Sequence, residues 1–183
     1  MKTVFYSIIF SSYLLFPSAL PAQKKANLEG IAIGGTAPEI ELPTVDGEVF
    51  RLSQLRGKLV LLDFWASWCA PCRRKMPRLL EVYDKYKNTG FDEGEKGFEI
   101  VLVSLDRNDN YWKSSIKKDS TGILLNVGDM KGWDCAAAKK YNVRIIPSSV
   151  LLDGKGKIIA IDLSPKDLSK KLKRLKRGGW FWF

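Results

Sequence analysis

Two cysteines with two residues between them, Cys69 and Cys72, are the side chains of this sequence best suited to chemistry. They follow the apolar run 59–65 directly and stand ahead of a helix-like stretch. A strand that delivers Cys69 to the first turn of a helix points its sulfur at unpaired backbone N–H groups and at the positive end of the helix dipole. Thiols in such motifs titrate at about 3.5 to 7.5 instead of ~8.5. Cys69 is therefore the predicted nucleophile of a thiol–disulfide exchange.

The residues around Cys69 fit the same chemistry. Cys72 lies one helical turn further on, on the same face and screened by the first turn, which suits it to resolve a mixed disulfide. Pro71 has no N–H to lose and helps to fix that turn. Trp68, Ala70 and Pro71 are the candidate substrate contacts beside the sulfur. A purely structural bridge is the alternative, but so tight a spacing ahead of a helix favours the redox-active disulfide.

Length and composition predict one exported domain. The 183 residues fit a single domain of the usual size. Residues 1–22 have the charged start, short apolar core and small-residue exit of a signal peptide, with cleavage expected after Ala22. An uncleaved anchor is the alternative. We expect a flexible lead over 23–33, a domain over 34–177 and an aromatic tail over 178–183, and a periplasmic location in a bacterium.

The charge and the ligand types exclude several functions. The chain has a formal net charge of +10, and much of the excess lies in 166–177, most simply a solvated helix face. It has no histidine and three cysteines, which argues against a metal site. No nicotinamide or flavin motif is present, so no cofactor is expected. Nucleic acid is not an expected partner.

The pattern of strands and helices predicts an α/β domain with a mixed sheet flanked by helices and an added N-terminal β-hairpin. The hairpin turns at Asp46-Gly47, and Ser53 is expected to cap a short helical turn. Buried strands are expected over 58–65 and 98–105, with a surface loop at 88–97 between them. The remaining expectations are a helix after Cys69 kinked at Pro77, a helix over 111–118, a strand over 123–127, a helix capped by Asp134, strands over 149–152 and 157–161, and a last helix opened by Ser164 and Pro165.

Residues 64–72 together with Ile146-Pro147 resemble the thioredoxin fold, and the fuller pattern from about residue 34 to the last helix looks like its exported TlpA/ResA branch. The resemblance implies that Pro147 is cis and faces the cysteines. It also implies that the Ile146 backbone pairs with an extended substrate, and that Trp68 and Pro147 shape the docking surface.

Asp63 lies six residues before Cys69, where thioredoxins carry a buried acid. Burial disfavours its charge, so we expect it to be partly neutralised and to exchange a proton with Cys72 as a general acid/base. An Asp that faces solvent or pairs with a nearby lysine is the alternative.

Many TlpA/ResA-like proteins have a glutamate three residues after the second cysteine, where this chain has Lys75. Arg73, Arg74 and Lys75 would add positive potential at the thiolate, or would form an exposed basic turn.

These observations favour an exported enzyme that reduces protein disulfides; the absence of a histidine between the cysteines and the presence of Pro71 favour the reducing direction. The resemblance suggests apocytochrome c or other exported thiol proteins as substrates and a membrane-bound electron donor. The rivals are a thiol peroxidase, disfavoured because Ala66 replaces that branch's threonine, and a scaffold protein of the same fold.

Two features have no place in this chemistry. Cys135 would form a regulatory or intermolecular bond, or would fill space as a half-buried thiol. The tail Trp180 to Phe183 consists of four aromatics, which would contact a membrane surface peripherally, fold back on its own domain or pair with another subunit.

Overall fold

The computed structural model describes residues 31–176. The predicted signal peptide, most of the predicted lead and the predicted aromatic tail lie outside the described residues.

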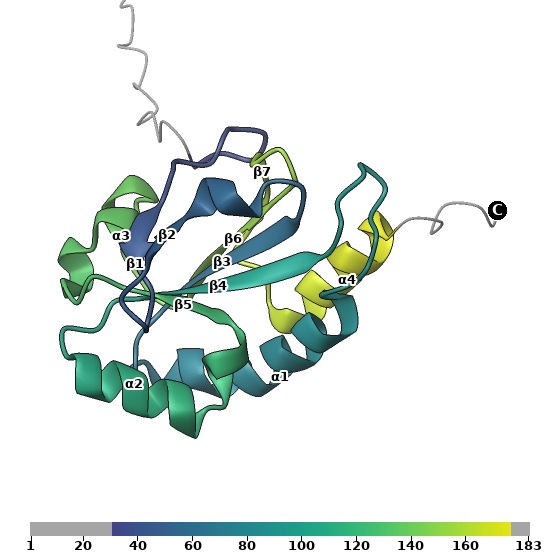
Figure 1. Ribbon diagram of the computed structural model, residues 1–183. Coiled ribbons are helices and arrows are strands. Elements are labelled where there is room, and N and C mark those ends of the chain that lie inside the picture. Colours follow the sequence, from purple (N-terminus) through teal and green to yellow (C-terminus); the bar gives the residue numbers. More distant parts are fainter. Residues whose placement is uncertain (1–30, 177–183) are drawn as a thin grey trace, which may run out of the picture.

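A five-stranded mixed sheet forms the centre of the molecule (Figure 1). Its order is β5-β4-β3-β6-β7. The first three strands pair in parallel, and the last two are antiparallel to their neighbours. The strands are β3 (Leu59–Trp65), β4 (Phe98–Ser104), β5 (Leu125–Val127), β6 (Ser148–Leu152) and β7 (Ile158–Ile161). This arrangement confirms the predicted mixed sheet, with the strand that leads to Cys69 in its middle.

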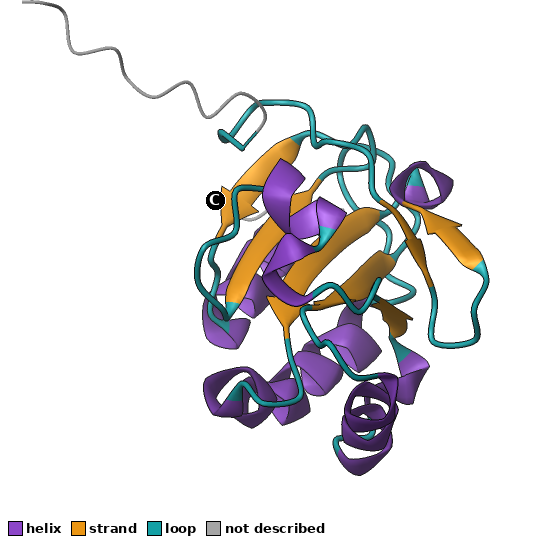
Figure 2. Ribbon diagram, turned by 90° about the vertical axis from the view of Figure 1, so that its left-hand side faces the viewer, coloured by secondary structure: helices purple, strands orange, loops and turns teal. Residues whose placement is uncertain are grey.

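Helices cover both faces of the sheet (Figures 1 and 2). Helices α1 (Ala70–Tyr86), α2 (Asp109–Lys118) and α4 (Pro165–Leu175) lie on one face, and the short α3 (Ala136–Lys140) lies on the other. The predicted hairpin is present as β1 (Glu41–Pro43) and β2 (Val49–Arg51). Short 3-10 turns are η1 (Leu52–Leu55), η2 (Thr121–Ile123) and η3 (Gly132–Asp134).

The apolar pattern explains why α1 and β3 pack where they do. Every residue of β3 is buried, as a run that is apolar except for Asp63 predicts for a strand covered on both faces. Helix α1 buries a stripe at helical spacing against the sheet: Cys72, Met76, Leu79, Val82 and Tyr86. The helix continues through Pro77. Its first turn therefore stands at the carboxyl end of β3.

Three local expectations differ from the structure. Ser53 lies inside η1 and caps nothing. Asp134 does not cap α3, because its carboxylate instead contacts Lys139 Nζ at 2.9 Å. Residues 88–97 are not a plain surface loop, since Phe91 and Glu95 are buried there. Glu95 accepts a hydrogen bond from the Gly154 N–H at 3.2 Å, which ties this segment to the turn between β6 and β7.

Candidate active site

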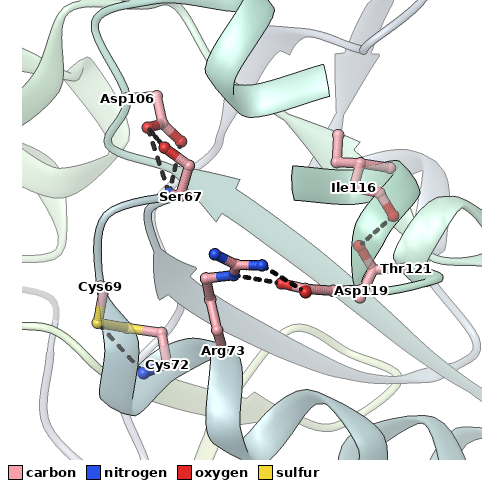
Figure 3. Close-up of polar contacts among 8 residues, drawn as sticks. All are labelled: Ser67, Cys69, Cys72, Arg73, Asp106, Ile116, Asp119 and Thr121. Atoms are coloured by element: carbon pink, nitrogen blue, oxygen red, sulfur yellow. Dashed lines mark hydrogen bonds and ion pairs between the residues drawn. A yellow bond between two sulfur atoms is a disulfide. The ribbon is translucent and has the colours of Figure 1, made fainter. Parts of the chain in front are cut away.

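Cys69 and Cys72 form a disulfide at the start of α1 (Figure 3). Cys69 is the N-cap residue, and its Sγ accepts a hydrogen bond from the Cys72 N–H at 3.2 Å. Pro71 lies in the first turn, where its missing N–H costs no hydrogen bond. Cys69 is 4% exposed and Cys72 is fully buried. Both cysteines are thus buried, and Cys69 is the one that retains some contact with solvent.

The segment Ile146-Pro147 reaches the same edge of the sheet. Strands β3 and β6 are antiparallel neighbours with Phe64 opposite Ser148. Pro147, directly before β6, therefore lies at the end of the sheet where β3 ends and the chain continues to Cys69. The Ile146-Pro147 peptide bond is cis, which confirms that expectation. Ile146 is half-buried, while Pro147 is exposed.

The structure also places the other candidate contacts. Trp68 is 57% exposed, and Ala70 and Pro71 are exposed beside the disulfide. The surface around Cys69 is thus open on the side of these three residues.

Asp63 is buried in β3 and paired with a lysine. Its Oδ2 lies 2.6 Å from Lys75 Nζ, and the Lys75 side chain is itself mostly buried. Apart from this contact, no described group donates a hydrogen bond to either carboxylate oxygen. Burial raises the pKa of Asp63, Lys75 opposes that rise, and the charge of Asp162 adds to it. Burial and the lysine pairing, which the sequence presented as alternatives, occur together.

The basic residues after Cys72 do not act as a free positive patch. Lys75 points to Asp63, and Arg73 binds Asp119 at the end of α2 through two hydrogen bonds of 2.6 and 2.7 Å (Figure 3). Arg74 is exposed and has no ion pair within residues 31–176. Two of the three cations therefore have an acidic partner, which offsets the positive potential that they would add at the thiolate.

Asp106 is a site residue that the sequence reasoning missed. It follows β4 and is buried, and its carboxylate accepts hydrogen bonds from the Ser67 N–H at 3.0 Å and the Ser67 hydroxyl at 2.6 Å (Figure 3). The Ser104 hydroxyl also donates to it at 2.8 Å. An acid directly after a buried strand was the available signal, because carboxyl ends of parallel strands meet at one sheet edge.

The third cysteine is not part of the disulfide. Cys135 is a free thiol and fully buried, more so than the half-buried thiol expected as one alternative. Burial raises the pKa of its thiol. A buried, protonated thiol is poorly suited to the regulatory or intermolecular bond that was the other alternative.

Neither a metal cluster nor a membrane span is found in the part of the chain that the structure describes. Residues 31–176 contain no group of three potential acidic, cysteine or histidine ligands placed to hold an ion. Within the same range, no helix is long and apolar enough to cross a bilayer.

A cysteine pair at the start of the helix that follows the central strand of a mixed sheet, with a cis-proline at the same end of that sheet, defines the thioredoxin-like class of protein. A family model described as thioredoxin-like matches residues 57–158, and the chain belongs to that family. Within it, the chain falls among the TlpA/ResA-like proteins and is a thiol-disulfide oxidoreductase.

The relatives agree with this assignment. The chain is 34% identical to the thiol-disulfide oxidoreductase ResA of Bacillus thuringiensis over 134 residues, 73% of this chain and 71% of the relative. It is 32% identical to ResA of Geobacillus kaustophilus over 149 residues, 80% of this chain and 79% of the relative.

Solved structures are similar too. The thioredoxin domain of a thiol-disulfide oxidoreductase from Bacteroides vulgatus matches with a TM-score of 0.72 and 31% identity, covering 81% of this chain and all of that domain. A thiol-disulfide oxidoreductase from Bacteroides fragilis matches with a TM-score of 0.68 and 34% identity, covering 76% of this chain and 98% of that one.

Proposed function

We propose that this thiol-disulfide oxidoreductase is exported and reduces disulfides in other exported proteins through Cys69 and Cys72. The observation that carries the proposal is the position of Cys69, whose sulfur caps α1 and which is the less deeply buried residue of the pair. The backbone N–H that now donates to this sulfur would stabilise a thiolate in the reduced enzyme.

The reaction has two exchange steps. The Cys69 thiolate attacks one sulfur of the substrate disulfide, a mixed disulfide forms, and the first substrate thiolate leaves. The Cys72 thiol loses its proton and attacks Cys69 Sγ, which releases the second substrate thiolate. The substrate gains two electrons and two protons, and the enzyme becomes the Cys69–Cys72 disulfide, the form described above.

Asp63 is the proposed acceptor of the Cys72 proton. A buried carboxylate with a raised pKa holds a proton more readily than an exposed one, which suits Asp63 to accept the proton of Cys72. Lys75 would then hold the charged form of Asp63 between turnovers.

Substrate docking is proposed to involve Trp68, Ala70, Pro71, Ile146 and Pro147. Four of these five are exposed around Cys69, and Ile146 is half-buried at the same sheet edge. Apocytochrome c and other exported thiol proteins are the proposed substrates. A membrane-bound dithiol donor would return the two electrons that each turnover consumes.

Insulin reduction and peroxide consumption, measured side by side, test the activity. We expect the wild type to reduce insulin with dithiothreitol as donor and Cys69→Ser to lose this rate. Cys72→Ser should accumulate a mixed disulfide with the substrate, visible by mass spectrometry. Rapid peroxide consumption without insulin reduction would instead support a thiol peroxidase, and neither activity would support a scaffold.

Export is tested separately in a bacterial host. We expect the full-length chain to be recovered from the periplasm with an N-terminus at Gln23, and a chain that lacks residues 1–22 to stay in the cytoplasm. Recovery of both from the cytoplasm would contradict export.

Flotation with liposomes, with and without Trp180 to Phe183, tests the proposed peripheral membrane contact.

A further inference from the structure

A hollow lies beside the active-site loop, on the side of Trp68 that faces α2. It has a volume of about 330 Å³, near the lower end of the range for ligand pockets. The surface that lines it is almost wholly apolar, and its residues include both buried and exposed ones. They come from the Cys69 loop, the corner between β4 and α2, and η3: Trp68, Leu105, Asp106, Arg107, Asn108, Tyr111, Gly132 and Trp133.

Three aromatic side chains border this hollow and are largely exposed. Trp68 is 57% exposed, Tyr111 69% and Trp133 42%. The rings of Trp68 and Trp133 contact each other with centroids 6.3 Å apart. Large apolar side chains scattered singly on a surface are normal, but a cluster around a concavity is typical of an interaction site.

Arg107 and Gly132 line the hollow on the side of η3. The Arg107 side chain lies over Gly132, where an added Cβ would come within 2.6 Å of Arg107 Nε. The Arg107 guanidinium reaches Asp134 Oδ2 at 3.5 Å. Arg107 and Asp134 thus form an exposed ion pair at the rim of the hollow, while the lining itself is apolar.

We propose that this hollow receives a bulky apolar side chain of the substrate protein, within a few residues of the cysteine that Cys69 attacks. The inference rests on the proposed function and names its substrate class. Because Cys69 is only 4% exposed, a substrate sulfur must come into contact with the surface around it. Trp68, the residue before Cys69, is one wall of the hollow, so the hollow lies within reach of a substrate segment bound at Cys69.

The geometry selects an extended segment with an aromatic or large aliphatic side chain. The hollow is too small for a helix, and the faces of Trp68 and Trp133 offer offset or tilted ring contacts. The Arg107 charge at the rim is paired with Asp134, so the selection depends on the apolar lining and not on the charge of the substrate.

Two matched peptide disulfides test this selection. Each has one cysteine joined to 2-nitro-5-thiobenzoate, followed two residues later by tryptophan in one peptide and by serine in the other. The measured quantity is the ratio of second-order reduction rates, tryptophan peptide over serine peptide. We expect a ratio of about ten for the wild type, the effect of one well-packed aromatic contact of about 1.4 kcal/mol.

Trp133→Ala and Tyr111→Ala should each lower that ratio to about two or three, because each removes a wall of the hollow. Ile123→Ala is the matched control, since Ile123 is also a large exposed apolar residue but does not line the hollow. Its ratio should equal that of the wild type. Because each ratio compares two substrates on one enzyme preparation, a general loss of folded protein cancels.

Equal rates for the two peptides on the wild type would overturn the proposal, as would variants that keep the wild-type ratio. The proposal is also overturned if deletion of 178–183 raises the tryptophan-peptide rate in the wild type alone, since the chain's own tail would then be the occupant. A dimer that Trp133→Ala dissociates in sedimentation would assign the hollow to a second copy. Failure to reduce either peptide would instead contradict the proposed function itself.

Discussion

At the scale of single residues, Asp106 controls the loop that carries the dithiol. Its buried carboxylate joins the end of β4 to Ser67, two residues before Cys69. Asp106→Ala should lower the free energy of unfolding by about 1 to 3 kcal/mol, because it leaves these donors without their acceptor. It should also slow alkylation of Cys69 in the reduced enzyme, as the loop loses its anchor.

Urea unfolding and alkylation kinetics measure both effects. Asp84→Ala is the control, because Asp84 is an exposed acid whose ion pair with Lys87 lies on the surface of α1. That change should alter stability by no more than about 0.5 kcal/mol. If Asp106→Ala resembles the control in both measurements, Asp106 does not position the loop.

The raised pKa of Asp63 predicts how the stability of the protein depends on pH. Its raised pKa means that the folded protein holds this proton more tightly than the unfolded chain does. The protonated carboxyl therefore stabilises the folded protein at pH values below the ordinary pKa range of aspartate. This stabilisation is lost as pH rises through the pKa that Asp63 has in the folded protein. The stability of the wild type relative to Asp63→Asn should therefore fall as pH rises above about 4, by at most ~1.4 kcal/mol per pH unit.

Unfolding of both proteins across pH measures this difference, and a difference independent of pH would contradict the raised pKa. Asp63→Asn should also slow resolution of the mixed disulfide by about tenfold or more at neutral pH, because the proton acceptor is gone. Unchanged resolution would remove Asp63 from the proposed mechanism.

The sequence identifies site residues when their partners are close in the chain. Cys69 and Cys72 are recognisable from spacing alone, since one helical turn brings them together. Asp106 and Ser67 are 39 residues apart, and they meet only because β3 and β4 are parallel neighbours. The contact of Lys75 with Asp63 likewise depends on how α1 packs on β3.

At the scale of elements, the first turn of α1 is fixed to α2 by Arg73 and Asp119. This pair is bidentate and only 27% and 14% exposed at its two side chains. A double-mutant cycle with Arg73→Met and Asp119→Asn should give a coupling of about 1 to 2 kcal/mol, above the range for exposed pairs.

The pair Lys113 and Asp109 on α2 is the matched control, because its side chains are about half exposed. A cycle there should give about 0.3 to 0.5 kcal/mol. If the two cycles give equal couplings in urea unfolding, the contact between α1 and α2 does not depend on Arg73.

Long elements are more predictable than short ones in this chain. The sequence predicts β3 and β4 to within one residue of their observed ends, because each is a run of seven residues in which apolar side chains predominate. α4 begins where Ser164 and Pro165 indicate, and the Ser164 hydroxyl accepts from the Asp167 N–H. α3 has five residues, too few for a periodic pattern, and tertiary ion pairs take the Asp134 side chain that was expected to cap it.

At the scale of the whole molecule, the thiols differ in access. The described fold contains one disulfide and one free thiol, that of Cys135, which is buried beside α3. Ellman's reagent should therefore detect about no thiol in the native oxidised protein and about one after denaturation, because burial blocks the thiolate. A rapidly reacting thiol in the native protein would contradict this.

The topology brings together what the sequence keeps apart. The ends of β3 and β4, the start of β6 and the segment η3 surround the dithiol, although they span residues 63–148. The mixed sheet and the dithiol could be predicted from local pattern and resemblance. The hollow at Trp133 could not, because it depends on the packing of η3 against the Trp68 loop.

The central claim is that the start of α1 holds the Cys69 sulfur as a thiolate, and iodoacetamide alkylation tests it most directly. The protein is the variant with Cys72→Ser and Cys135→Ser, and the reference is the same chain unfolded in urea. At about pH 6, where a free cysteine is almost wholly protonated, Cys69 in the folded protein should react about tenfold faster or more. Equal rates in the folded and unfolded chain would contradict the claim.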